Sequence, residues 1–134
     1  MEKTMELAVK YRDYVIGLRR YFHQHPELGG QEVNTSRRVI EELTAMGLEP
    51  KVIGSYKTAV ICDIHGEHPG KTIALRADMD ALNVQELNDC PYKSQVDGVM
   101  HACGHDGHTA SLLGAAKVLM ERRDQIRGTV RLIF

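Results

Sequence analysis

The order of the periodic segments in residues 72–134 places the strongest constraint on the fold. Residues 72–77 predict a strand, residues 109–121 predict a buried helix with many small side chains, and residues 129–134 predict another strand. A strand, a helix and a second strand in this order are typical of a βαβ unit with parallel strands. We therefore expect an α/β protein with a mixed, mostly parallel sheet and flanking helices.

The first half of the chain predicts two helices and two strands. Apolar residues at three- and four-residue steps indicate a helix over residues 6–24, which ends before Pro26. Thr35 or Ser36 is expected to cap a second helix that runs to Met46 and ends at Gly47. Residues 49–53 and 58–65 predict strands, and the strands 58–65 and 72–77 flank a short turn-rich loop, which suggests a hairpin.

Composition excludes several classes of partner. The chain has 134 residues, of which 26% are charged, and its net charge is −1. This balance gives no electrostatic basis for binding nucleic acid or an anionic membrane surface. The first residues lack the apolar run of a signal peptide, and no segment is long and apolar enough to cross a bilayer. We expect one domain, a cytoplasmic location and no nucleic-acid or membrane partner.

A dense group of metal-binding side chains lies in residues 98–110. His101, Cys103, His105, Asp106 and His108 fall within eight positions. Imidazole and thiolate are preferred donors for zinc and similar metals. In an extended segment every second side chain points the same way, so the side chains at 101, 103 and 105 can converge. The segment therefore predicts a metal site.

Two carboxylates follow the strand predicted at residues 72–77. Asp78 and Asp80 are two positions apart and can face the same way. Ligand sites in open α/β sheets lie beyond such strand ends. Solvated turn residues or a helix cap are the alternative interpretation of this pair. Because the metal-binding group lies downstream, we expect Asp80 to orient an imidazole ligand.

These motifs resemble those of a known family. Residues 76–82, Arg-Ala-Asp-Met-Asp-Ala-Leu, and residues 98–110, Gly-Val-Met-His-Ala-Cys-Gly-His-Asp-Gly-His-Thr-Ala, resemble the aminoacylase/carboxypeptidase-type metal-dependent amidohydrolases. The most similar branch contains hippurate hydrolase, N-acetyldiaminopimelate deacetylase and the auxin-conjugate hydrolases. Residues 20–28 and 128–134 are similar to further segments of this branch, and Asn83 replaces a usual proline.

The resemblance implies a function and a site. It implies hydrolysis of N-acyl amino acids or similar small amides by a water molecule that a divalent metal activates. Cys103 and His105 would be ligands in a site for two ions of zinc, manganese, cobalt or nickel, and Asp80 would support a metal-bound ligand. No ligand role is carried over to His101 or His108.

The resemblance also implies parts that this sequence does not contain. These are a Gln-Pro-Ala-Glu-Glu type segment with the general base and another ligand, two further histidine ligands, and a lid domain that commonly mediates dimers. Residues 1–134 are thus expected to be the incomplete N-terminal portion of a catalytic domain, without its lid. We expect this portion to be inactive alone and the intact enzyme to form a homodimer.

Two other functions stay open. The chain could be a non-catalytic metal-binding or partner-binding module, in which Cys103 and His105 join His101 or His108 in a closed four-ligand site. A thiol nucleophile activated by a neighbouring histidine is the other alternative. That mechanism has no need of the surrounding Asp and His side chains, so the metal site is the preferred interpretation.

Overall fold

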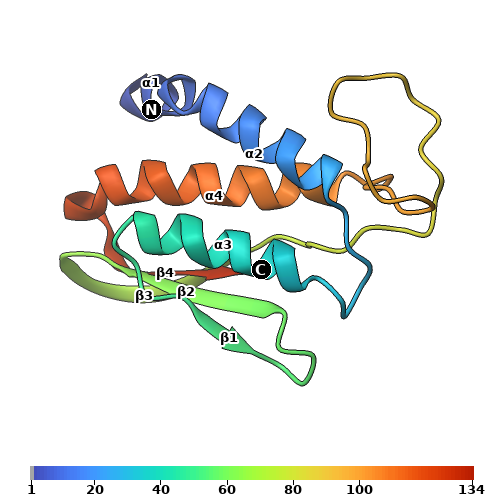
Figure 1. Ribbon diagram of the computed structural model, residues 1–134. Helices are drawn as coiled ribbons and strands as arrows, with labels where there is room; N and C mark the ends of the chain where they lie inside the picture. The colour runs from blue at the N-terminus through green and yellow to red at the C-terminus, as the bar shows by residue number, and fades with distance from the viewer. Residues whose placement is uncertain (1) are drawn as a thin grey trace.

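The computed structural model describes residues 2–134, which form one layer of helices on a four-stranded sheet (Figure 1). The helices are α1 (Glu2–Lys10), α2 (Arg12–Gln24), α3 (Val33–Ala45) and α4 (His105–Glu121), and a short 3₁₀ helix η1 (Arg123–Gln125) follows α4. The strands are β1 (Lys51–Ile53), β2 (Ala59–His65), β3 (His68–Arg76) and β4 (Arg127–Ile133). The α/β class predicted from the sequence is confirmed.

The sheet has the order β1-β2-β4-β3. Strands β3 and β4 are parallel and joined through α4, which confirms the predicted βαβ unit. The pairs β1–β2 and β2–β4 are antiparallel, so the sheet is mixed but not mostly parallel as predicted.

The predicted hairpin between residues 58–65 and 72–77 is wrong, because β4 lies between β2 and β3. The backbone N–H of Gly66 donates to the carbonyl of Gly128 at 2.9 Å, so the connection runs around the start of β4. A Cβ added at Gly66 would lie 2.2 Å from the Ile126 carbonyl oxygen. Only a glycine allows this close approach. The loop composition predicted a turn correctly, but it could not reveal a third strand inserted beside it.

The core lies between the helices and one face of the sheet. Alternate residues of the two central strands face it, as the period of a strand requires. They are Val60, Cys62, Ile64, Val130 and Leu132. Leu18 and Phe22 of α2, Val39 and Leu43 of α3, and Leu113 of α4 pack against them. Cys62 is only 2% exposed and belongs to this core as a small apolar side chain.

The first predicted helix is divided in the structure. Instead of one helix over residues 6–24, the chain forms α1 and α2, which meet at Tyr11. Hydrogen bonds from the Tyr11 N–H to the Leu7 carbonyl and from the Val15 N–H to the Tyr11 carbonyl continue across the junction. The junction is therefore a distortion in one helical path rather than a loop.

The start of α3 also differs from the prediction. Thr35 and Ser36 lie inside the helix and are buried. The capping group is the Glu27 carboxylate, which accepts the backbone N–H groups of Asn34 at 3.0 Å and Thr35 at 2.8 Å. A carboxylate at a helix N-terminus satisfies free N–H groups and complements the helix dipole. At its other end the helix stops before Gly47, as predicted, whose φ of +80° is in the left-handed region.

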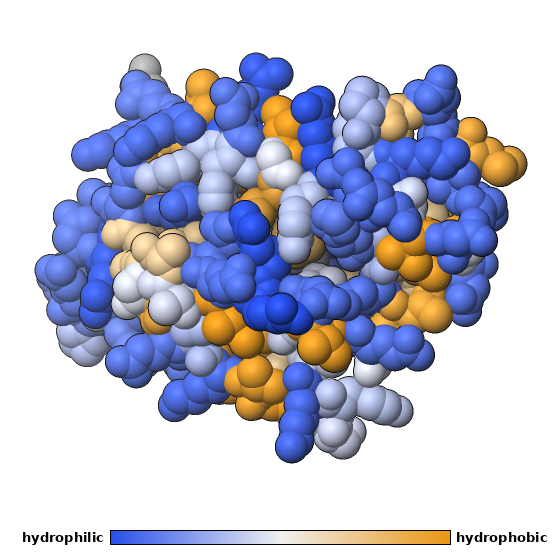
Figure 2. Space-filling model, viewed as in Figure 1, coloured by the Kyte–Doolittle hydropathy of each residue, from blue (hydrophilic) through white to orange (hydrophobic). Residues whose placement is uncertain are grey.

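Most of the surface in Figure 2 is hydrophilic, with separate apolar patches. Exposed apolar side chains include Ile73 and Leu75 on β3, Val52 and Ile53 on β1, and Leu87 in the loop before α4. Within residues 2–134, no helix combines the length and apolar character needed to cross a membrane.

Candidate metal centre

The two aspartates lie beyond the C-terminal end of β3, where the sequence placed them. The hydrogen bonding between β3 and β4 continues to Ala77, whose N–H donates to the Ile133 carbonyl at 2.9 Å. Asp78 and Asp80 follow directly. The hydroxyl of Thr109 on α4 donates to the Asp78 carbonyl at 2.9 Å, so the aspartate segment is attached to the start of α4.

The metal-binding segment enters α4 earlier than predicted. The helix begins at His105 rather than near Thr109, so His105 and His108 belong to its first turn. Gly104 precedes the helix with a φ of +81°, a conformation that favours glycine and turns the chain into the helix. Residues three apart share a helix face, and the rings of His105 and His108 stack with centroids 5.3 Å apart.

His105 contacts Asp80, the carboxylate that was expected to orient an imidazole. The Nδ1 atom of His105 lies 2.9 Å from Oδ1 of Asp80 and 3.0 Å from its carbonyl oxygen. Because both partners are acceptors, Nδ1 carries the hydrogen. The Nε2 atom is then left with a free lone pair, which is the arrangement found when an imidazole binds a metal through one nitrogen and a carboxylate through the other.

A group of three possible ligand atoms includes His105. Asp78, His105 and His108 each offer a possible ligand atom, and these atoms lie within 4.8 Å of one another. Cys103 is an exposed free thiol two residues before His105 and is not a member of this group. Asp78 and His108 were visible in the sequence, but only the helical position of His108 brings it to the same face as His105.

His101 does not converge with Cys103 and His105 on one point. Its side chain is buried and 4% exposed, and neither ring nitrogen has a hydrogen-bond partner among the described residues. Burial lowers the pKa of this imidazole, which favours its neutral form. The alternation expected for an extended segment fails because residues 101–104 form a turn, in which the Gly104 N–H donates to the His101 carbonyl at 3.2 Å.

A cavity of about 630 Å³ adjoins the metal-binding segment. It is lined by Cys103 and His101, by Arg19 and His23 of α2, and by Tyr92 of the loop before α4. His101 and His23 lie in the wall of one cavity because distant segments of the chain pack together there.

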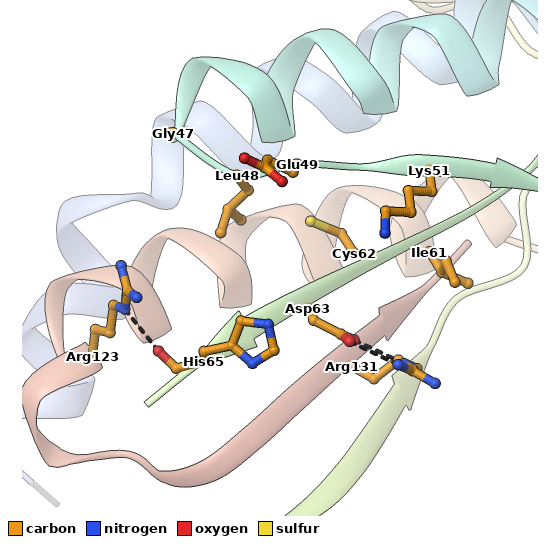
Figure 3. A pocket seen from close by; sticks show the side chains of 10 residues that line it. All are labelled: Gly47, Leu48, Glu49, Lys51, Ile61, Cys62, Asp63, His65, Arg123 and Arg131. Atoms are coloured by element: carbon orange, nitrogen blue, oxygen red, sulfur yellow. Dashed lines mark hydrogen bonds and ion pairs between the residues drawn. The ribbon is translucent and has the colours of Figure 1, made fainter. Parts of the chain in front are cut away.

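A second cavity lies beside β2, and none of the residues in the segment 98–110 line it (Figure 3). Its volume is about 350 Å³, and Arg131 forms a two-point ion pair with Asp63 in its wall, at 2.8 and 2.7 Å. Arg123 donates to the His65 carbonyl, as the dashed line shows. Burial raises the pKa of the Cys62 thiol there, so it is a poor candidate for a thiolate ligand or nucleophile.

The donors at the end of β3 and the start of α4 fit a divalent metal. Imidazole, carboxylate and thiol groups are available within a few residues of one another, and one imidazole is already oriented by a carboxylate. This donor set suits zinc and neighbouring transition metals. An α/β sheet with these donors at a strand end is the class of site found in metal-dependent hydrolases.

Comparison with known proteins identifies the family. Residues 74–134 match the model of peptidase family M20/M25/M40. Thermostable carboxypeptidase 1 of Saccharolobus solfataricus is 49% identical over all of this chain, and N-acetylcysteine deacetylase of Bacillus subtilis is 48% identical over 90% of it. The chain belongs to this peptidase family, as the resemblance of its motifs predicted.

A solved structure agrees with this assignment. A Bacillus subtilis protein described as a dinuclear metal binding peptidase from the M20 family superposes with a TM-score of 0.89 at 46% identity. The match covers 93% of this chain and 35% of that one. The chain also spans only about a third of the length of the two relatives named above.

Proposed function

We propose that this chain contributes part of the metal centre of an amidohydrolase that cleaves N-acyl amino acids or similar small amides. The observation that carries the proposal is the contact between His105 Nδ1 and Asp80, which leaves Nε2 free to bind a metal. The names of the relatives, a carboxypeptidase and a deacetylase of an N-acyl amino acid, support hydrolysis of an amide bond.

His105 and Cys103 are the ligands in this proposal, and Asp80 acts through His105. Zinc, manganese, cobalt or nickel would suit these donors, and a bound ion would supply the acidity that activates water. Asp80 holds the His105 ring in one tautomer and one orientation, and it makes the free nitrogen a better donor. Asp78 and His108 lie close enough to complete the coordination or to position the substrate.

The proposal extends to a longer protein. We infer that residues 1–134 are the N-terminal portion of a catalytic domain, and that the general base, the remaining ligands and the lid come from other residues. Loss of a positioned acid/base costs about 10²- to 10⁴-fold in rate. The chain alone should therefore not hydrolyse N-acyl amino acids. We further propose a cytoplasmic homodimer for the intact enzyme.

Cobalt binding tests the ligand assignment directly. The 134-residue chain is titrated with Co²⁺ and followed by absorbance, because a thiolate ligand gives a charge-transfer band in the near ultraviolet. We expect the band in the parent chain, its loss in Cys103→Ser, and no binding in His105→Ala. Cys90→Ser is the matched control, because Cys90 is also a free thiol near the same cavity. A band that survives in Cys103→Ser would overturn the assignment of this thiolate.

An activity assay separates a catalytic fragment from a complete enzyme. N-acetyl amino acids are incubated with the Zn²⁺-loaded chain, and release of the free amine is measured. We expect no turnover above that of Cys103→Ala. Turnover that disappears in Cys103→Ala would show that residues 1–134 suffice for catalysis.

A further inference from the structure

We propose that His23 is a positioning residue for the metal centre, because it holds Asp106 and through it the first turn of α4. This inference rests on the proposed function, since it concerns where His105 and Cys103 are presented. Nothing in the sequence motif explains why a buried imidazole on α2 should contact the residue next to His105.

His23 is placed between two buried carboxylates. Its Nδ1 lies 2.7 Å from Oδ2 of Asp106, and its Nε2 lies 3.1 Å from Oε1 of Glu86. The side chain of His23 is 4% exposed and those of both carboxylates are 1% exposed. Arg19, one turn earlier on α2, adds a contact of 2.9 Å from Nε to the same oxygen of Asp106.

Each carboxylate also accepts a hydrogen bond from a backbone segment of the proposed metal centre. Asp106 follows His105 directly, and its Oδ1 accepts the backbone N–H of Gly107 at 2.9 Å. Glu86 accepts the backbone N–H of Ser94 at 2.6 Å and lies in the loop that leads to Cys103. Figure 1 shows this loop beside the end of α2 and the start of α4. His23 thus connects the segments that carry both proposed ligands.

The burial of these charges suggests a role beyond stability. Apolar residues of similar volume often replace a buried ion pair without loss of stability, whereas removal of one partner leaves an uncompensated charge. A buried network of this kind therefore adds little stability to the packing of a helix. Its directed hydrogen bonds do, however, fix the position and orientation of the side chains that they join. Metal ligands need such fixed geometry, and the residues that support them affect affinity strongly.

Two substitutions of His23 separate its contacts. The side-chain nitrogen of Asn lies near the position of Nδ1, and that of Gln lies near the position of Nε2. His23→Asn can therefore keep the Asp106 contact, while His23→Gln keeps the Glu86 contact instead. His25→Gln is the matched control, because the His25 ring packs against Tyr21 with centroids 4.8 Å apart, whereas both carboxylates contact His23.

The measurements are the Co²⁺ dissociation constant and the thermal midpoint of the metal-free chain. We expect both His23 variants to have similarly lowered midpoints, but His23→Gln to bind Co²⁺ about tenfold more weakly than His23→Asn. A merely structural role would lower the midpoint in both and leave their Co²⁺ affinities equal, which would overturn the inference. His25→Gln should match the parent chain.

A second variant covers the case in which the His23 variants do not fold. Arg19 is 37% exposed, so Arg19→Met should fold, and we expect severalfold weaker Co²⁺ binding because Asp106 loses one partner. Unchanged affinity in this variant would overturn the inference. If the parent chain itself gives no thiolate band, the proposed function fails. If that band is normal and the variants bind equally, only the role of His23 fails.

Discussion

Asp80 is the residue whose contact was predicted from the sequence most directly. Its spacing after the strand indicated a partner for an imidazole, and the structure places its Oδ1 2.9 Å from His105. In Asp80→Asn the amide cannot accept as strongly from Nδ1, so we expect Zn²⁺ affinity to fall about 10- to 100-fold. Competition with a chromophoric chelator measures this, and Asp89→Asn, at an exposed position, is the control. Equal affinity in the two variants would contradict the prediction.

Glu86 makes stability depend on pH. Burial opposes its ionisation, but the Ser94 N–H, His23 and Asn88 outweigh this effect and hold its pKa below the ordinary value of 4.5. A lowered pKa in the folded state stabilises the protein above pH 4.5, and that contribution is lost as the pH falls through the folded pKa.

We therefore expect Glu86→Gln to be less stable at pH 7 by about 1–3 kcal/mol, the cost of impairing a buried hydrogen-bond network. It should lose less free energy of unfolding than the parent chain between pH 7 and about 3. Urea unfolding at both values measures this. The same pH dependence in both chains would show that Glu86 is not the group responsible.

At the scale of helices, the contact between α2 and α4 depends on a glycine. A Cβ added at Gly114 of α4 would lie 2.4 Å from Cγ2 of Val15 on α2, closer than two carbons can approach. The stiff side chain of a helical valine adapts poorly. Overpacking costs about 1–3 kcal/mol, more than the roughly 1 kcal/mol that Ala gains over Gly in a helix.

Gly114→Ala should therefore lower the free energy of unfolding by about 1 kcal/mol, as the difference between overpacking and helix propensity. Gly17→Ala is the opposite case, because a Cβ at this exposed position of α2 meets nothing within 4 Å. It should stabilise the chain by up to about 1 kcal/mol. Chemical denaturation of the two variants checks both signs, and stabilisation by both would disprove the clash with Val15.

Helices and strands were predicted well where the local spacing of apolar residues defines them. They were predicted poorly where contacts with residues far along the chain determine a helix cap or a strand pairing. The strand–helix–strand unit and the stop at Gly47 depend on local pattern and backbone preference, and both are confirmed. The cap of α3 comes from Glu27, and one of the two neighbours of β2 is β4, which lies far along the chain. For the same reason the sequence revealed Asp80 and His105, but not the buried network that joins His23 to Asp106.

The whole molecule has a free sheet edge. Among residues 2–134, β3 pairs only with β4, and all nine of its residues are exposed. Ile73 and Leu75 are 57% and 37% exposed, and Leu75 lines an apolar cavity of about 460 Å³ between β3, α1 and α4. Pro69 and Lys71 protect only the first half of the strand, because proline and lysine discourage edge pairing.

A free edge with apolar side chains pairs readily with another chain. We therefore expect the 134-residue chain to self-associate as its concentration rises, and Ile73→Lys to stay monomeric at about tenfold higher concentration, because a charge on the edge disfavours pairing. Sedimentation equilibrium measures the difference. Val9→Lys is the control, because Val9 is 68% exposed on α1, belongs to no strand and does not line the cavity beside β3. If Val9→Lys suppressed association as strongly as Ile73→Lys, general charge would be the cause. Because the relatives are about three times longer, the same substitution should matter less in a protein whose further residues cover this edge.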